Sequence, residues 1–206
     1  MTIFLMYHQD VIEEIIALKT ADLALRDRLV KEGKLFEGYH KAMEELHISN
    51  AHRLNEIIDQ YGFPILEKIG KEASQAAWLV VQHAISLPSF MKRYQELLMK
   101  VESPSQISKE QLAYLSDRIA VFEEQPQLFC TQFDWDANGL LSPQKYDDLS
   151  TVNKRRNHLG WNTVEEQTQI IRAQAVNENN HCPNNLESRQ QEMKLWKYKV
   201  GWLRKS

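Results

Sequence analysis

The sequence predicts a mainly α-helical α+β protein, a helical bundle with a small two-stranded β-hairpin and a basic C-terminal tail. Glycine and proline are scarce, with 7 and 6 among 206 residues. Apolar residues recur at intervals of three and four through most of the first 122 residues, which is the period of an amphipathic helix. Between residues 127 and 142, two short strand-like runs flank a turn rich in aspartate, asparagine and glycine.

The composition is that of an ordinary globular chain. Apolar residues make up 43% and charged residues 26%, and the formal net charge is -3, which excludes collagen, a disulfide scaffold and a mostly disordered protein. No apolar run approaches the ~20 residues of a transmembrane helix. The N-terminus lacks a signal-peptide pattern, and Cys130 and Cys182 do not suggest a disulfide framework. We therefore expect a cytoplasmic protein, with a secreted effector as the alternative.

Five helices are expected in the first 122 residues. They span residues 8–32, 37–61, 71–87, 88–101 and 108–122. Gly33 ends the first, and a short helical turn closed by Gly70 precedes the third. The third is apolar nearly all round, which is typical of a helix in the middle of a bundle. Ser103-Pro104-Ser105 is the expected linker before the fifth, which begins at a capping box of Ser108 and Gln111.

The pattern changes after residue 122. Strands are expected at residues 127–133 and 139–142, and helical patterning returns at residues 146–159 and 163–176. We expect a single helical domain over residues 1–176, with its hairpin near residues 127–142. Residues 177–206 would form a polar linker and a basic aromatic tail helix.

The tail is positively charged, since residues 187–206 hold six Lys or Arg and two Glu, a local charge of +4. Its aromatic residues either dock on the bundle or, together with the basic residues, contact a protein partner or an anionic membrane surface. We expect no nucleic-acid partner and no transmembrane segment.

Polar residues in two of the predicted helices are candidates for a functional site. Gln82 and His83 lie in the most apolar helix, where a buried polar group costs a few kcal/mol unless it is paired. Histidine is also the side chain best suited to proton transfer near neutral pH. Asp117 and Arg118 point about 100° apart on a helix, so each needs its own partner. A satisfied core and a solvated helix surface are the alternatives.

Several motifs, in this order, resemble an uncharacterised family of bacterial domains. They are Tyr61-Gly62-Phe63-Pro64, Trp78-Leu79-Val80-Val81-Gln82-His83-Ala84, Tyr114-Leu115-Ser116-Asp117-Arg118, residues 127–132 and Arg155-Arg156-Asn157-His158-Leu159-Gly160. The resemblance covers about half of the chain and implies that six polar residues belong to a shared pattern. They are His83, Asp117, Arg118, Gln127, Thr131 and Gln132. Phe129-Cys130 stands where the family has Tyr-Gly, so a close backbone approach to a ligand is in doubt there.

The functional hypothesis is a cleft that gathers these residues. His83 would act as general acid or base, and Asp117 would orient it or hold a substrate donor. Arg118, and Arg155 or Arg156, would bind an anionic group, although two adjacent arginines are also typical of a solvated helix end.

The remaining cleft residues, Gln82, Gln127, Thr131 and Gln132, would supply neutral hydrogen bonds. This arrangement predicts a hydrolase or group-transfer enzyme that acts on a small anionic substrate, without a cofactor or metal. The alternative is a non-catalytic interaction module of the effector or immunity type.

Two weaker patterns could bind metal ions. Asp134-Trp135-Asp136-Ala137-Asn138-Gly139 opens a segment that resembles an EF-hand calcium loop. Lys145 occupies the position of the bidentate glutamate, and a hairpin turn explains the same residues. His40, Glu44 and His47 share one helix face and could bind zinc, but no ligand from outside that helix is evident.

Overall fold

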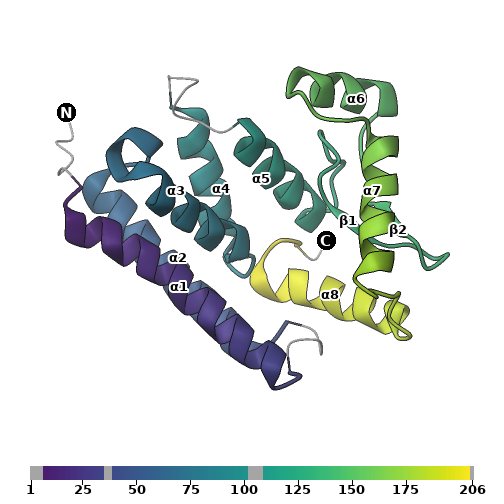
Figure 1. Cartoon of the computed structure of the whole chain (residues 1–206), viewed down its shortest axis with the longest axis horizontal. Coiled ribbons are helices and arrows are strands. Elements are labelled where there is room, and N and C mark those ends of the chain that lie inside the picture. The colour runs from purple at the N-terminus through teal and green to yellow at the C-terminus, as the bar shows by residue number, and fades with distance from the viewer. Residues whose placement is uncertain (1–6, 35–38, 102–108, 205–206) are drawn as a thin grey trace. The chain divides into compact units, whose positions relative to one another are not determined.

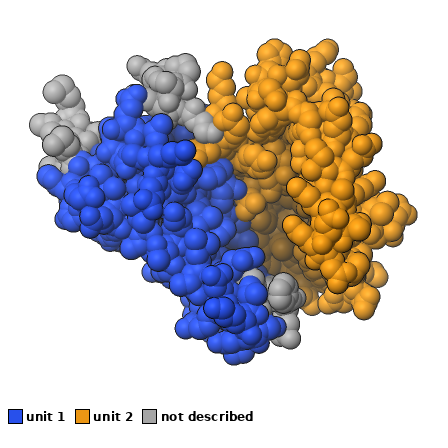
Figure 2. Space-filling view, in the orientation of Figure 1, with its two compact units in different colours: residues 1–108 blue, residues 109–206 orange. Residues whose placement is uncertain are grey.

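The computed structural model describes residues 7–34, 39–101 and 109–204 (Figure 1). This part of the chain contains eight helices and a two-stranded antiparallel sheet, which confirms the mainly α-helical class with a hairpin. The chain forms two compact units, residues 1–108 and residues 109–206 (Figure 2). The expected single domain over residues 1–176 stays a prediction. The expected linker Ser103-Pro104-Ser105 and the capping residue Ser108 lie outside the described residues.

Four helices build the first unit. They are α1 (Gln9–Lys31), α2 (Lys41–Tyr61), α3 (Leu66–His83) and α4 (Pro88–Met99). The α3 helix contacts each of the other three, which is the central position that its nearly all-apolar sequence predicts. Its small residues Ala73, Ala76 and Ala77 are fully buried, so neighbouring helices can pack closely against it. The remaining core side chains of this unit include Ile15, Leu54, Ile57, Val80, Val81 and Met91.

Two glycines shape the path of the chain in the first unit. Gly62 follows α2 with a φ of 85°, and Gly70 has a φ of 75° inside α3, where it kinks the helix. Both angles lie in the left-handed region that glycine adopts without a Cβ clash. The expected helical turn before residue 70 is therefore the first turn of α3.

The second unit contains four helices and the hairpin. Its elements are α5 (Lys109–Phe122), β1 (Phe133–Trp135), β2 (Leu141–Pro143), α6 (Leu149–His158), α7 (Val164–Asn177) and α8 (Leu186–Val200). In the hairpin, Phe133 pairs with Pro143 and Trp135 with Leu141. Cys130, Val152 and Val164 form a buried cluster in this unit, with Tyr146 and Leu149 packed against it.

The expected strand over residues 127–133 is wrong, because the hairpin lies at residues 133–143 and residues 127–132 form an irregular loop. Cys130 has a φ of 58°, which interrupts any extended run. The backbone N–H groups of Leu128, Phe129 and Thr131 donate to the Asp117 carboxylate and so are not available for a strand ladder. A side chain from α5 therefore overrides the local strand preference.

The tail forms α8, and its aromatic residues dock on α5 within the second unit. The ring centroid of Phe122 lies 5.0 Å from that of Trp202 and 5.8 Å from that of Trp196. The Lys197 Nζ donates to the Val121 carbonyl oxygen at 3.0 Å. None of the described helices combines the length and the apolar character needed to cross a bilayer.

Candidate functional site

A carboxylate and two imidazoles meet inside the first unit, each from a different helix. Asp22 lies on α1, His47 on α2 and His83 at the end of α3. The Asp22 Oδ2 is 2.7 Å from the His83 Nδ1 and 3.0 Å from the His47 Nε2. The Asp22 side chain is 1% exposed, whereas the His83 side chain is 28% exposed. We call these three residues the histidine–aspartate centre.

Tyr39 extends the centre on the side of His47. Its hydroxyl oxygen is 2.7 Å from the His47 Nδ1. Burial, with a contribution from Glu44, raises the pKa of Tyr39 well above its ordinary range, so the phenol keeps its proton and can donate it to His47. The His47 proton then lies on Nε2, the nitrogen that faces Asp22. The His47 and His83 rings also pack together, with centroids 4.8 Å apart.

Asp22 is held in its ionised form. Burial by itself raises a carboxyl pKa, but the interactions with nearby His47 and His83 outweigh burial and hold the pKa of Asp22 well below its usual range. Among the residues that the structure describes, no donor has hydrogen-bonding geometry to the second oxygen, Oδ1. The His83 Nε2 likewise has no hydrogen-bond partner in the described part of the chain. One ring edge of His83 therefore remains available to a ligand.

The three residues of the centre could also hold a transition-metal ion. One ligand atom from each lies within 4.8 Å of the others, and two imidazoles with one carboxylate suit zinc. Of the set expected on α2, only His47 belongs to this group. The His40 Nδ1 accepts the Ala42 N–H at 3.2 Å, and Glu44 accepts the Ser86 hydroxyl at 2.6 Å.

Sequence reasoning missed Asp22, although a signal was present. The buried residues of α1 include Ile15, Asp22 and Leu29, which are spaced by seven and so lie on one face. An aspartate in the middle of an apolar helix face must find a partner in the core, because an unpaired buried charge is costly. That requirement identifies a buried acid, but it does not identify its histidine partners.

In the second unit, Asp117 organises the irregular loop at residues 127–132. This carboxylate is fully buried, and its Oδ1 accepts the N–H groups of Leu128 and Phe129 at 2.8 and 3.1 Å. Its Oδ2 accepts the N–H of Thr131 at 2.9 Å. Burial raises the pKa of Asp117, and these backbone donors lower it in part. His83 therefore contacts the carboxylate of Asp22, whereas the carboxylate of Asp117 accepts hydrogen bonds from backbone N–H groups.

Gln127 fixes the same loop from within. Its buried Nε2 donates to the carbonyl oxygens of Gln132 and Gln144, both at 3.0 Å, and its Oε1 accepts the N–H of Gln132 at 2.7 Å. The Gln132 Nε2 donates to the Thr131 hydroxyl oxygen at 2.9 Å. The amides of Gln127 and Gln132, which were expected to bind substrate, therefore hold the loop and connect it to Gln144.

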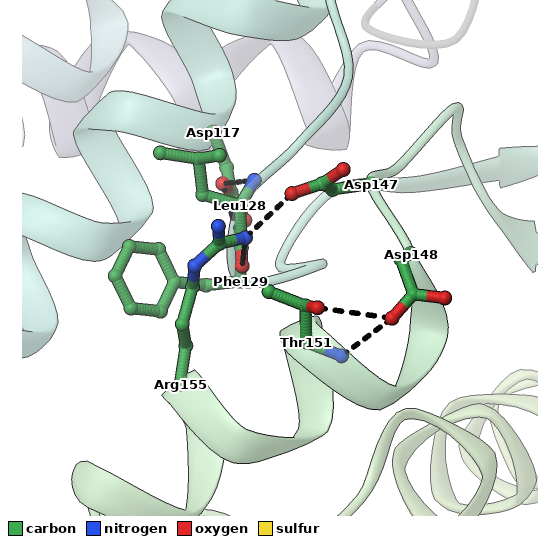
Figure 3. Close-up of polar contacts among 7 residues, drawn as sticks. All are labelled: Asp117, Leu128, Phe129, Asp147, Asp148, Thr151 and Arg155. Carbon is green, nitrogen blue, oxygen red and sulfur yellow. Dashed lines mark hydrogen bonds and ion pairs between the residues drawn. The ribbon is translucent and has the colours of Figure 1, made fainter.

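Both arginines of α6 contact this loop. The Arg155 Nη1 donates to Asp147 at 2.9 Å and lies 3.3 Å from the Leu128 carbonyl oxygen (Figure 3). The Arg156 Nη1 donates to the carbonyl oxygen of Phe129 at 2.9 Å. Asp117 thus holds the loop by its N–H groups, and the arginines hold it by its carbonyl oxygens.

The predicted site residues fall into two groups. One consists of His83 and its neighbour Gln82 in the first unit. The other gathers around the loop in the second unit and comprises Asp117, Gln127, Thr131, Gln132, Arg155 and Arg156. Arg118 lies on α5, where burial lowers its pKa. The expected cleft draws on both groups and stays a prediction.

The segment that resembles a calcium loop forms the hairpin turn. Asp136 accepts the N–H groups of Asn138 and Leu140 at 2.8 and 3.0 Å, and it accepts the Ser142 hydroxyl at 2.7 Å. This pattern is typical of an aspartate that stabilises a turn. A hairpin turn is the alternative to a calcium loop that the sequence analysis gave for these residues.

A model of a family of unknown function (DUF6624) matches residues 9–177, so the chain belongs to that family. The resemblance to an uncharacterised domain family is thereby confirmed. No curated protein and no solved structure matches the chain significantly.

Proposed function

We propose that the protein is a hydrolase or group-transfer enzyme in which His83 transfers a proton. The observation that carries this proposal is the 2.7 Å contact between the His83 Nδ1 and the buried Asp22 carboxylate. The contact fixes the ring and places its proton on Nδ1. The His83 Nε2 then presents a lone pair, and the partial exposure of this side chain lets a substrate reach it.

The proposed chemistry needs only proton transfer and positioning. The His83 Nε2 takes a proton from a water molecule or a substrate hydroxyl, whose oxygen attacks an acyl or phosphoryl centre. The imidazolium that forms is stabilised by ionised Asp22, and its proton passes to the leaving group. Asp22 is the positioning residue in this scheme. A small anionic substrate remains part of the proposal.

The test is hydrolysis of p-nitrophenyl acetate and p-nitrophenyl phosphate by the full chain. His83→Gln keeps a polar group near Asp22 but removes the proton acceptor, so the rate should fall at least about 100-fold. Asp22→Asn should lower kcat more than it changes KM, because it disturbs ring orientation and not substrate binding. Circular dichroism verifies that each variant is folded.

His52→Gln is the matched control, since His52 is exposed on the same helix as His47. It should hydrolyse both probes at the wild-type rate. Equal hydrolysis by wild type and His83→Gln would contradict the proposal, as would no hydrolysis of either probe. Loss of activity on treatment with EDTA would show that the centre works through a metal ion, contrary to the metal-free scheme.

A second candidate is an interaction module whose tail contacts an anionic membrane surface. One observation favours it: α8 has no buried residue, and its Leu195 is 63% exposed beside basic residues. Co-sedimentation with vesicles that contain phosphatidylserine tests this candidate. Binding that is lost in Leu195→Glu supports the module, and no binding by the wild-type chain removes it.

A further inference from the structure

We propose that a pocket in the second unit binds a small oxyanion, a carboxylate or phosphate group, beside Arg156. The cavity has a volume of about 150 Å³, and its walls include Tyr114, Arg156, Trp161, Asn162 and Gln167. All of its lining residues belong to the second unit. The inference goes beyond the proposed function, because it concerns a different unit and requires no catalysis.

Arg156 is a buried cation whose partners are all neutral. It is 3% exposed. Its Nε and Nη2 donate to the carbonyl oxygen and the Oδ1 of Asn162 at 2.6 and 2.8 Å, and its Nη1 contacts the carbonyl oxygens of Phe129 and Cys130 at 2.9 and 3.3 Å. Within the described ranges, no carboxylate lies within ion-pairing distance of this guanidinium. A buried charge without a directly paired carboxylate favours an anion in the adjacent cavity.

The guanidinium retains capacity for a ligand. Arginine has five N–H groups, and four contacts to neutral oxygens leave at least one N–H without a partner among the described residues. This N–H can join the charge in binding an oxyanion, for which arginine is well suited.

The described lining of the pocket supplies no anionic group to pair with this charge, since it contains no Asp or Glu. Burial, reinforced by nearby Asp117, raises the pKa of the lining residue Cys130 to about 12, so its thiol stays neutral at physiological pH. Asp117 interacts electrostatically with Arg156, but no ion pair joins the two side chains and Asp117 does not line the pocket.

Two side-chain amides add neutral donors. The Asn162 Oδ1 accepts from Arg156, which orients the amide and leaves its Nδ2 hydrogens for a ligand. Gln167 lines the pocket from α7, and its amide has no partner in the described part of the chain. Trp161 closes one wall, with its ring centroid 5.4 Å from the Arg156 guanidinium carbon.

The size of the pocket limits the ligand. Pockets for drug-sized molecules are roughly 300–1,000 Å³, so a cavity of about 150 Å³ holds a much smaller group. A free inorganic anion, a short carboxylic acid or the terminal phosphate of a larger molecule meets this limit. One cation and several neutral donors, with no acid in the described lining, favour an oxyanion in each case.

The test titrates the full chain with sodium phosphate and with sodium acetate at constant ionic strength, using isothermal titration calorimetry. We expect saturable binding of at least one anion, and the anion that binds more tightly identifies the ligand class. Gln167→Glu places a negative charge in the pocket and should weaken binding at least about tenfold. Gln169→Glu makes the same change at an exposed position of α7 and should leave the affinity within twofold of wild type.

Tryptophan fluorescence gives a second readout. The anion should change the emission of the wild-type chain, and Trp161→Phe should remove that change. The proposal is overturned if neither anion binds saturably up to about 50 mM, a concentration that would detect even weak sites. It is also overturned if Gln167→Glu binds as tightly as wild type. His83→Gln should bind the anion normally, so failure of the catalytic proposal leaves this result unaffected.

Discussion

Two buried aspartates serve different purposes because their partners differ. Asp22 faces two imidazoles, of which His83 is partly exposed and can exchange protons with a ligand. Asp117 faces three backbone N–H groups, which cannot. A carboxylate that binds only backbone donors fixes a loop in one conformation. The same chemical group therefore supports a candidate reactive centre in one unit and a rigid loop in the other.

Asp117→Asn should destabilise the second unit strongly. One of its two oxygens becomes an NH₂ group, which faces backbone N–H donors and cannot accept from them. Hydrogen bonds to charged groups contribute about 1.5–3 kcal/mol each, so a loss of about 3 kcal/mol or more is expected in urea unfolding. Asp147→Asn changes an exposed pair with Arg155, which solvent screens, and should reduce stability far less. Equal losses in the two variants would contradict a loop-holding role for Asp117.

The two thiols should differ in reactivity. Burial raises the pKa of Cys130 to about 12, and the residue is fully buried, so its reactive thiolate is nearly absent at pH 8. Cys182 is partly exposed. The native chain should therefore react with Ellman's reagent at one thiol, and the second thiol should react only after denaturation. Cys182→Ser should abolish the fast reaction; a fast reaction that persists in this variant would show that Cys130 is accessible.

At the scale of elements, regular helices follow from local patterns, whereas the loop does not. The central position of α3 follows from its apolar sequence, and Gly62 and Gly70 end or kink helices where expected. The run at residues 127–133 has strand-like composition, but it is held by Asp117, which is ten residues or more away in sequence. The histidine–aspartate centre could be predicted only in part, for the same reason. His83 is conspicuous in an apolar helix, while its contact with Asp22 depends on how α1 and α3 pack.

The α6 helix depends on its N-terminal cap to place its two arginines. The Asp148 Oδ1 accepts the N–H and the hydroxyl of Thr151, both at 2.9 Å (Figure 3). Asp148→Ala removes this cap and should lower the midpoint of urea unfolding with an unchanged m-value. Asn157→Ala, at an exposed position near the other end of α6, should leave the midpoint unchanged or slightly raise it. An unaltered midpoint in Asp148→Ala would show that the cap does not stabilise the helix.

At the scale of the whole molecule, sequence patterns and packing divide the chain at different places. Composition marks a boundary after residue 176, because the following segment is polar. The structure separates residues 1–108 from residues 109–206, and the tail belongs to the second unit. The reason is Trp202, which is buried against Phe122 of α5. A contact between residues this far apart in sequence leaves no trace in local periodicity.

The tail should therefore contribute to the stability of the second unit. Trp202 is 5% exposed and stacks on Phe122 with a centroid separation of 5.0 Å. Trp202→Ala removes this buried ring and should destabilise the chain by about 3–5 kcal/mol in urea unfolding. A chain that ends at Asn177 loses the same contact and should show a loss of at least similar size.

Leu195→Ala is the control for this prediction, since the Leu195 side chain is largely exposed on α8 and should change stability by no more than about 0.5 kcal/mol. If Trp202→Ala and the shortened chain are as stable as the control, the tail does not pack on α5 in solution. The apolar side chains of α8 would then be available to a partner, which is the outcome that the interaction module requires. A large loss confined to Trp202→Ala and the shortened chain assigns the tail a structural role.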